Sequence, residues 1–459
     1  MINQAINNLI KYGLSKNLLT TDDQTYVLNK LGDLLNIHEV SVEKDQEMSI
    51  DDILNHLLKY AIENNIVIDN NFEARTAFEG RLMDCLMPRP SELNKMFRSK
   101  YKKSPQQATK FFHDFSQDCL YIKSNPLKNN LNFLYKSQYG DLDLHVNCLK
   151  FDAFIDQERY FNFNHRQVSI SVNNEKNAWT MQYLPYPILE EQCLISRKDH
   201  LEPYNNDRTF EELIDFINKF PQYFIMSDVS KSMSNDGILP YHYLQGGKHV
   251  FPIESAQVAG KYKNGRVRVE VLDWPVSAIR LIGNNENKLL DVMHDLYQNW
   301  STYSDDNLKI QAKTDNETHN FIDVFIKLDG SKFNVYMVFK NTRKTKEYPQ
   351  GIFQPKQTSV FKNFGILEDL GLFEISKSIY DDLERVKNIL MDKTDISKYS
   401  GLIYLKTWFD MIKDKEQPKD LDLFLTKQVG ELFENNMKET NVFKFGSKED
   451  FIAFVEKAV

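Results

Sequence analysis

Two hairpin signals constrain the fold of this chain more than any other feature. Asn264-Gly265 and Asp329-Gly330 are dipeptides that are typical of tight hairpin turns. Residues 266–271 alternate charged and apolar side chains after the first turn, and largely apolar segments flank the second turn at 321–328 and 333–339. Because such turns join neighbouring antiparallel strands, we predict antiparallel sheet and not a doubly wound parallel one.

The two ends of the chain show helical spacing instead. Ser49 followed by Asp52 is a capping-box pattern ahead of apolar residues spaced three and four apart, and Ser447 precedes a similar run. We therefore predict an α+β protein with four regions along the chain. These are a helical region at 1–115, a first α+β module at 116–275, a second α+β module at 276–400 and a helical region at 401–459.

Composition argues against several classes of protein. The 459-residue chain has a formal net charge of -8, whereas nucleic-acid-binding domains carry basic surfaces. It contains no run of about 18 apolar residues that could span a bilayer, and its first residues lack the basic region of a signal peptide. Its cysteines are far apart, as is typical of free thiols in a reducing compartment; they are Cys85, Cys119, Cys148 and Cys193. We expect a cytoplasmic protein that binds neither nucleic acid nor membrane.

The segment at 237–247 carries the most information about function. It reads Gly-Ile-Leu-Pro-Tyr-His-Tyr-Leu-Gln-Gly-Gly and resembles the active-site signature of class II galactose-1-phosphate uridylyltransferases, Ile-Leu-Ser-His-Asp-His-Phe-Gln-Gly-Gly. Tyr241 and Tyr243 stand where the family has histidines, and His242 stands where it has aspartate. Further likenesses keep the family's order and approximate spacing; they lie at 87–92, 179–186, 220–225, 274–281, 341–343 and 347–353. The resemblance implies two antiparallel-sheet modules of histidine-triad-like type.

The resemblance also implies a reaction. In the family, UDP-glucose gives its uridylyl group to a histidine and galactose 1-phosphate then collects it; imidazole suits this because it attacks as a neutral nucleophile near neutral pH. The catalytic positions here are Tyr243 as the nucleophile position, Gln245 as a donor to phosphate oxygen, and His242, which directly precedes Tyr243 in the motif.

Tyrosine changes the chemistry of the nucleophile position. A phenol with a pKa near about 10 is mostly protonated at neutral pH, and its uridylyl ester would be a phosphodiester, far more stable than the phosphoramidate of histidine. Because side chains alternate along an extended strand, we predict that Tyr243 and Gln245 share one face, and one cleft, while His242 points away.

The same resemblance implies which residues would hold a nucleotide sugar. The candidates lie in or near preserved motifs and are His165, Arg166, Gln182, Tyr183, Gly246, Gly247, Asn341 and Arg343. Arginine is suited to a diphosphate because its planar guanidinium binds oxygens in pairs, although a surface ion pair explains either arginine equally well. The ligands implied are UDP-glucose and galactose 1-phosphate, and a homodimer is compatible with the sequence.

The cysteine and histidine groups of the family are broken in this chain. Phe151 stands where a Cys-x-x-Cys pair would need its second cysteine after Cys148, and residues 354–360 replace a histidine-rich segment. A structural zinc site needs about four convergent cysteine or histidine ligands, so we predict no metal and no cofactor.

Three functions stay open on the sequence. The first is a uridylyltransferase of the family, with activity in doubt because Tyr243 replaces the nucleophile. The second is a non-catalytic paralogue, a pseudoenzyme that acts as a nucleotide-sugar sensor or a protein-interaction scaffold. The third is an enzyme with altered chemistry at Tyr243 or His242.

Overall fold

The computed structural model describes residues 2–40, 47–123, 132–147, 163–202, 206–230, 241–355, 364–416 and 419–459. The chain falls into two compact units. The first comprises Met1–Ser124, Phe151–Ile170 and Thr180–Pro187, and the second comprises Asn125–Lys150, Ser171–Trp179 and Ile188–Val459.

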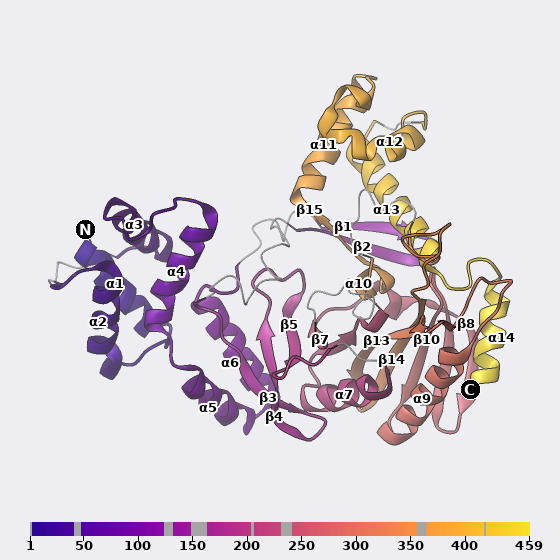
Figure 1. Cartoon of the computed structure of the whole chain (residues 1–459), viewed down its shortest axis with the longest axis horizontal. Coiled ribbons are helices and arrows are strands. Elements are labelled where there is room, and N and C mark those ends of the chain that lie inside the picture. The colour runs from indigo at the N-terminus through magenta and orange to yellow at the C-terminus, as the bar shows by residue number, and fades with distance from the viewer. Residues whose placement is uncertain are drawn as a thin grey trace. The chain divides into compact units, whose positions relative to one another are not determined.

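The first unit is mainly helical (Figure 1). Its helices are α1 (Ile2–Ser15), α2 (Gln24–Leu35), α3 (Ile50–Glu63), α4 (Phe72–Leu86), α5 (Pro90–Tyr101) and α6 (Pro105–Asp118), with a short 3-10 helix at Thr21–Asp23. Ser49 caps α3 by accepting a hydrogen bond from the backbone N–H of Asp52, as its sequence pattern predicts. Leu9 of α1 and Leu57 of α3 are fully buried, so the apolar spacing of each helix becomes a face turned into the core.

A ten-stranded sheet has the order β3-β4-β5-β7-β6-β13-β14-β10-β9-β8, and all of its strands except parts of β3 and β4 belong to the second unit. Its strands are β3 (Val168–Val172), β4 (Glu175–Tyr183), β5 (Glu190–Arg197), β6 (Phe224–Ser227), β7 (Tyr243–Lys248), β8 (Gln257–Asn264), β9 (Val267–Asp273), β10 (Ala278–Gly283), β13 (Asn320–Asp329) and β14 (Lys332–Asn341). From β5 to β8 every neighbouring pair is antiparallel. The sheet is continuous across the two predicted modules. β9 belongs to the first module and β10 and β14 belong to the second, and β10 pairs with both β9 and β14.

Both predicted hairpins are present in this sheet. Gly265 and Gly330 take φ angles of 57° and 60°, which glycine adopts without strain. Asn264 pairs with Val267, and the strands on either side of Gly330 pair over their full length.

Helices cover one face of the sheet (Figure 1). α7 (Asn206–Lys219) packs on β6 and β13, α9 (Glu286–Thr302) packs on β10 and β13, and α14 (Lys448–Ala458) packs on α9. Trp300 of α9 contributes to this core, with its ring edge against Phe339 and Phe454 at 5.4 and 5.5 Å between centroids. We call this side of the sheet the helical face.

A second core lies on the opposite face, which we call the front face. It joins the 3-10 helix η3 (Pro252–Ser255) and α10 (Ile366–Asp369) to a three-stranded sheet and to a helical group. That sheet is β1 (Asn132–Ser137), β2 (Gly140–Asn147) and β15 (Leu372–Ser376), with β15 parallel to β2. The helical group is α11 (Lys377–Met391), η4 (Ile396–Lys398), η5 (Ser400–Leu405), α12 (Lys406–Ile412) and α13 (Leu421–Thr440).

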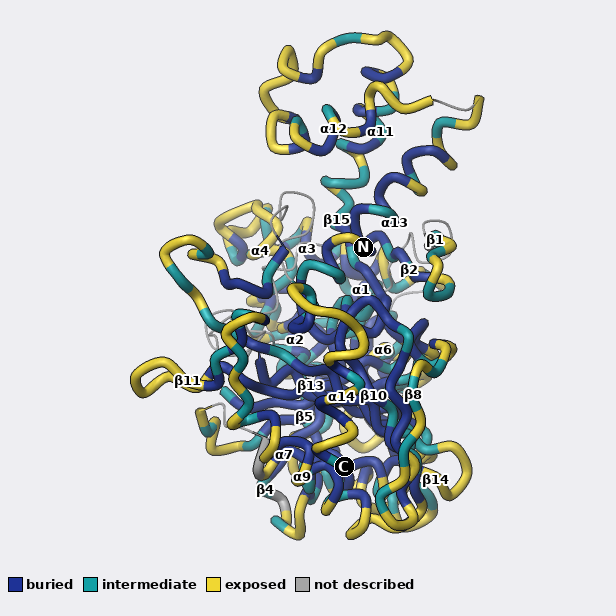
Figure 2. Tube along the Cα trace, turned by 90° about the vertical axis from the view of Figure 1, so that its right-hand side faces the viewer, coloured by how far each residue is buried: buried dark blue, intermediate teal, exposed yellow. Residues whose placement is uncertain are grey.

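The predicted α+β class is confirmed by helices and antiparallel sheet within one chain. The strands of the large sheet are largely buried, whereas the small hairpin of β11 (Lys313–Thr314) and β12 (Glu317–Thr318) is exposed (Figure 2). Among the residues that the structure describes, no helix combines the length and the apolar character needed to cross a membrane.

Candidate functional site

The tyrosine-bearing motif leads into β7, an inner strand of the large sheet. The part of the motif before Tyr241 lies outside the described residues. β5 and β6 flank β7, with Ser196 opposite Tyr243 and Met226 opposite Gln245. The motif side chains are enclosed, with exposed fractions of 4% for His242, 3% for Tyr243 and 3% for Gln245.

His242 points to the helical face. Its Nε2 lies 2.9 Å from Oε2 of Glu212 on α7, and Glu212 is 1% exposed. The backbone N–H of His242 donates to the carbonyl of Leu201 at 2.8 Å, and the imidazole meets Trp179 edge-on at 6.0 Å between ring centroids. An ionised carboxylate only accepts hydrogen bonds, so Nε2 is the donor, and the pair ties the strand to the helix.

Tyr243 and Gln245 point to the front face. Side chains alternate along a strand, and cross-strand partners share a face. Gln245 is opposite Met226, which belongs to the front-face core together with Phe325. The prediction that Tyr243 and Gln245 lie on the face opposite His242 is therefore confirmed. The prediction that they share a cleft stays a prediction, because neither of the two described surface pockets is lined by Tyr243 or Gln245.

Polar side chains gather on the same face as Tyr243. We call the set the buried polar cluster; its members are Asp228, Ser230, Asp323, Lys340 and Asp369, all buried or nearly so. Ser230 donates to Asp323 twice, from its backbone N–H to Oδ1 at 2.9 Å and from its hydroxyl to Oδ2 at 2.5 Å. Lys340 Nζ lies 2.6 Å from Oδ2 of Asp369.

Strand register brings this cluster to the nucleophile position. β6 pairs with β7 on one side and with β13 on the other, up to Ser227. When both pairings are extended by one residue beyond Ser227, Asp228 comes opposite Tyr243 on the β7 side and opposite Asp323 on the β13 side, on the front face. Oδ2 of Asp228 accepts a hydrogen bond from the backbone N–H of Ile366 at 3.4 Å, whereas its Oδ1 is buried without a hydrogen-bond partner.

Burial and neighbouring charges shift the acidity of the cluster. Burial and the nearby Asp228 carboxyl together raise the pKa of Asp323 to about 8, although the charge of Lys340 and the hydrogen bonds from Ser230 act to lower it. Burial opposes the charge of Lys340, but the carboxylates of Asp369 and Asp323 raise its pKa overall. At neutral pH Asp323 therefore holds a proton, and the direct contact of Lys340 is with Asp369.

None of the residues of the buried polar cluster is among the site residues predicted from the sequence. The sequence contains a weak signal for the cluster. Asp323 interrupts the apolar segment 321–328, and Lys340 directly follows the apolar segment 333–339; both segments form strands that are largely buried on both faces. A charged residue inside such a strand needs a buried partner.

His165 is the sequence candidate whose surroundings best suit a ligand in the first unit. Burial lowers the pKa of its imidazole to about 4, so the ring is neutral at physiological pH. Its Nε2 is buried without a hydrogen-bond partner, and the Tyr121 ring lies 4.9 Å away between centroids.

Arg166 is held by protein groups. Its Nη2 lies 2.6 Å from Oδ1 of Asp84, and its Nη1 donates to the carbonyls of Phe163 and His165, both at 2.9 Å. Its side chain is 11% exposed. These contacts occupy the donors that a diphosphate would use, so a structural role is the better explanation for this residue.

Gln182 and Tyr183 belong to the core of the first unit. Gln182 is 2% exposed and accepts a hydrogen bond from Gln167 Nε2 at 2.7 Å. The Tyr183 hydroxyl donates to the carbonyl of Thr109 at 2.9 Å, and its ring contacts Phe112. Both side chains therefore have packing roles of their own.

The remaining candidates lie in the second unit. Asn341 is engaged, since its Nδ2 donates to Asn320 Oδ1 at 2.6 Å and its Oδ1 accepts the backbone N–H of Arg343. The Arg343 side chain is half-buried and makes no direct hydrogen bond or ion pair among the described residues. It is therefore the candidate arginine with donors to offer.

The glycines of the motif serve close packing. A Cβ on Gly246 would come within 3.1 Å of Cys193 Sγ and 3.3 Å of the Phe224 carbonyl oxygen, and a Cβ on Gly247 within 3.1 Å of the Glu190 carbonyl oxygen. Strand packing therefore explains both glycines without a ligand.

Within the described ranges, no group of three or more histidine, cysteine, aspartate or glutamate residues is arranged to hold a metal ion. Cys148, the first residue of the broken Cys-x-x-Cys pair, lies outside those ranges. Cys85, Cys119 and Cys193 are buried free thiols, and burial raises the pKa of Cys85 to about 11 and that of Cys119 to about 12.

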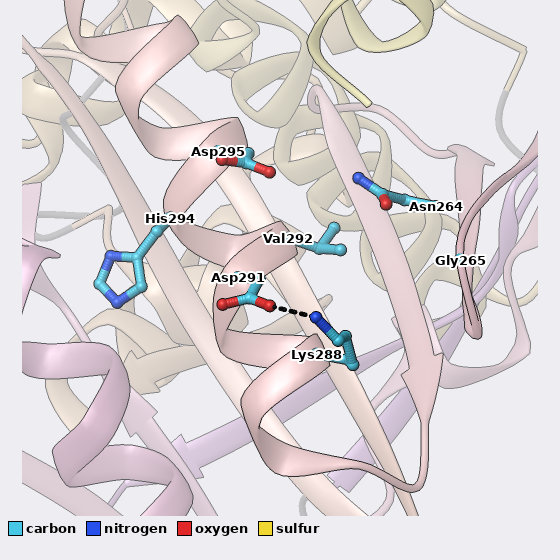
Figure 3. Close-up of a pocket in the computed structure, with 7 residues that line it drawn as sticks. All are labelled: Asn264, Gly265, Lys288, Asp291, Val292, His294 and Asp295. Carbon is cyan, nitrogen blue, oxygen red and sulfur yellow. Dashed lines mark hydrogen bonds and ion pairs between the residues drawn. The ribbon is translucent and has the colours of Figure 1, made fainter.

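A surface pocket of about 490 Å³ lies between α9 and the β8–β9 turn (Figure 3). Lys288 and Asp291 on its wall are exposed and pair with each other at 3.0 Å. His294 extends to the other side of α9 from Asn264, where its Nε2 lies 2.9 Å from Glu211 Oε1. Asn264 Nδ2 donates to the Val459 carbonyl at 3.0 Å, so the polar groups of this pocket turn to different partners and do not converge on a common point.

Comparisons with known proteins agree with the motif. Residues 17–158 match the family described as galactose-1-phosphate uridyl transferase, N-terminal domain. The galactose-1-phosphate uridylyltransferase of Clostridium acetobutylicum is 30% identical, with 97% of each chain covered. That of Lactococcus lactis is 27% identical with 96% of each chain covered, and that of Bacillus subtilis is 25% identical with 99% of this chain and 97% of its own covered.

Among solved structures, yeast Ap4A phosphorylase is 11% identical over 66% of this chain and 96% of its own, with a TM-score of 0.40, which is below the level that identifies a shared fold. The relatives in sequence, in contrast, extend over nearly the whole chain. This protein belongs to the galactose-1-phosphate uridylyltransferase family.

Proposed function

We propose that this protein binds a uridine nucleotide sugar, with UDP-glucose as the first candidate, and does not transfer the uridylyl group through a covalent enzyme intermediate. Family membership supports the ligand class. The identity and surroundings of the residue at the nucleophile position support the loss of transfer.

One observation carries the proposal. Tyr243 occupies the front-face position of β7, and the motif's histidine, His242, is bonded to Glu212 on the helical face. Imidazole is the group that suits a labile phosphoryl intermediate, but the imidazole of His242 lies on the helical face, opposite the face of Tyr243. Removing a nucleophile removes covalent catalysis but leaves ground-state contacts to the nucleotide, which other residues make.

Arg343 is the candidate contact to the nucleotide in the second unit, because its guanidinium has no direct partner among the described residues. Asn341 accepts the backbone N–H of Arg343 and shapes its surroundings. His165 in the first unit, whose buried Nε2 has no hydrogen-bond partner, is an alternative to Arg343 and not part of the same site, and Arg166, Gln182 and Tyr183 belong to the surroundings of that alternative. We place the protein's action in the cytoplasm, as a homodimer or a monomer, without nucleic acid or membrane as partner.

Labelled UDP-glucose, incubated with the purified protein with and without galactose 1-phosphate, tests the proposal. We expect binding at micromolar levels, or roughly -8 kcal/mol, without formation of labelled UDP-galactose. Robust exchange that Tyr243→Phe abolishes would overturn it and identify Tyr243 as a working nucleophile. A stable labelled adduct on Tyr243 would indicate altered chemistry, and absence of nucleotide binding would favour a scaffold.

A further inference from the structure

We propose that Asp228 and Gln245 bind hydroxyl groups of the sugar, so that the front face beside Tyr243 receives the hexosyl end of the ligand and disfavours its phosphates. The inference rests on the proposed binding of a nucleotide sugar. It assigns a specificity role to Asp228 and replaces the phosphate contact that the family resemblance implies for Gln245.

Two buried acceptors on neighbouring strands carry the inference. Asp228 is 6% exposed and Gln245 is 3% exposed, and both lie on the front face, where Gln245 is opposite Met226, two residues before Asp228. Oδ1 of Asp228 and Oε1 of Gln245 are each buried without a hydrogen-bond partner. Buried oxygens of this kind are costly to leave unpaired, so two of them on the same face of neighbouring strands call for groups that donate.

The charge balance of the buried polar cluster excludes phosphate from this position. The cluster has three carboxyl groups and one lysine, and the lysine contacts Asp369 directly. Ser230 donates twice to Asp323, the most buried of the other two, whose raised pKa keeps it protonated at neutral pH. Asp228 has no cation in direct contact among the described residues, and a phosphoryl group placed beside its carboxylate would meet like charge with little solvent between.

Sugar hydroxyls meet both requirements. A hydroxyl donates one hydrogen bond and accepts others, so it can satisfy the carboxylate of Asp228 and either end of the Gln245 amide. A phosphate has acceptors only and can satisfy neither oxygen. Neighbouring hydroxyls of a hexose also have the spacing to reach residues on adjacent strands.

Isothermal titration calorimetry with UDP-glucose and with UDP separates sugar from phosphate recognition. The wild-type protein is expected to bind UDP-glucose about tenfold more tightly than UDP, because a hydrogen bond to a charged acceptor is worth about that much. Asp228→Asn should reduce this ratio several-fold and should bind UDP itself more tightly, since the repelling charge is gone.

Two further variants complete the experiment. Gln245→Met keeps the size of the side chain and removes its polar end, so it should lower the ratio without changing the affinity for UDP. Asp291→Asn removes one negative charge from the exposed wall of the α9 pocket and should change neither quantity. Thermal melting of each variant checks that it is folded.

The results distinguish this inference from the proposed function. If UDP-glucose does not bind to the wild-type protein, both fall. If UDP binds but the wild-type protein shows no preference for UDP-glucose, or if both Asp228→Asn and Gln245→Met keep the wild-type ratio, the hydroxyl site is wrong and the binding proposal stands. If both variants keep the wild-type ratio, Asp228 Oδ1 and Gln245 Oε1 are satisfied by buried water and not by the sugar.

Discussion

Nε2 of His242 lies 2.9 Å from the Glu212 carboxylate, on the side of β7 opposite Tyr243. The contact is enclosed by protein on both sides, with exposed fractions of 4% and 1%. The His242–Glu212 contact therefore holds the histidine of the motif on the helical face. Removing either partner would leave the other as a buried polar group without a hydrogen bond.

Glu212→Ala is expected to destabilise the protein by roughly 2 kcal/mol or more, because His242 loses its buried partner. Glu212→Gln keeps an acceptor and should cost less. The free energy of unfolding from urea titration measures both. The neighbouring pair of Glu211 with His294 is a matched control, since its side chains are 35% and 30% exposed, and Glu211→Ala should cost less than about 1 kcal/mol. Equal losses at 211 and 212 would contradict a special role for the buried pair.

Asp323 is expected to make stability fall as pH rises. Its folded pKa of about 8 lies above the unfolded value of about 3.9, so between these values the folded state holds a proton that the unfolded state has released. The contribution is fully present below about pH 4, declines by up to about 1.4 kcal/mol per pH unit, and is gone above pH 8. Asp323→Asn should remove this slope, whereas Asp291→Asn should leave it. Identical pH profiles for wild type and Asp323→Asn would show that the carboxyl is not held protonated.

Tyr243→His alone should recover little uridylyl exchange. The new imidazole would stand beside Asp228 on the front face, and Tyr241 and the residues at 354–360 would still differ from the family pattern. The exchange assay with labelled UDP-glucose measures the outcome, with Tyr243→Phe as the inactive reference. Exchange at a large fraction of the rate of an active relative would mean that a single substitution separates this chain from catalysis.

The two candidate arginines should respond differently to substitution. Arg166→Gln removes contacts to Asp84 and to two carbonyls, so the melting temperature should fall while any effect on UDP affinity follows from folding. Arg343→Gln breaks no direct ion pair among the described residues and should weaken UDP binding several-fold at an unchanged melting temperature. The reverse pattern would exchange their roles.

Purified protein should contain far less than one zinc ion per chain by elemental analysis. A structural zinc would need convergent cysteine and histidine ligands, and the described cysteines are separate buried thiols with raised pKa values. A chelator should leave the melting temperature unchanged. Stoichiometric zinc, or a lower melting temperature with chelator, would refute this prediction.

Local chemistry made part of the structure predictable. The hairpins depend on the positive φ angles of Gly265 and Gly330, while Asn264 and Asp329 pair as the last strand residues before each turn, and the capping of α3 follows from Ser49. The opposite orientations of His242 and Tyr243 follow from strand alternation alone. Each of these features depends on residues close together in the chain.

The rest depends on partners far apart in the chain. Ser230 and Asp323 are separated by 93 positions, and Arg166 and Asp84 by 82. Nothing local distinguishes a charged side chain that meets a buried partner from one that meets solvent or a ligand. The sequence therefore pointed to Arg166 as a diphosphate ligand, where the structure gives it internal partners, and passed over Asp228.

The close packing around Gly246 limits how this chain could regain a catalytic histidine. Sliding β7 by one residue would exchange the two faces of the strand and bring His242 to the front. The same slide would push a larger side chain into the space where a Cβ on Gly246 already comes within 3.1 Å of Cys193 Sγ, and it would break the bond to Glu212. Realignment of the strand is thus costly, and substitution of residue 243 itself is the more direct return to histidine chemistry.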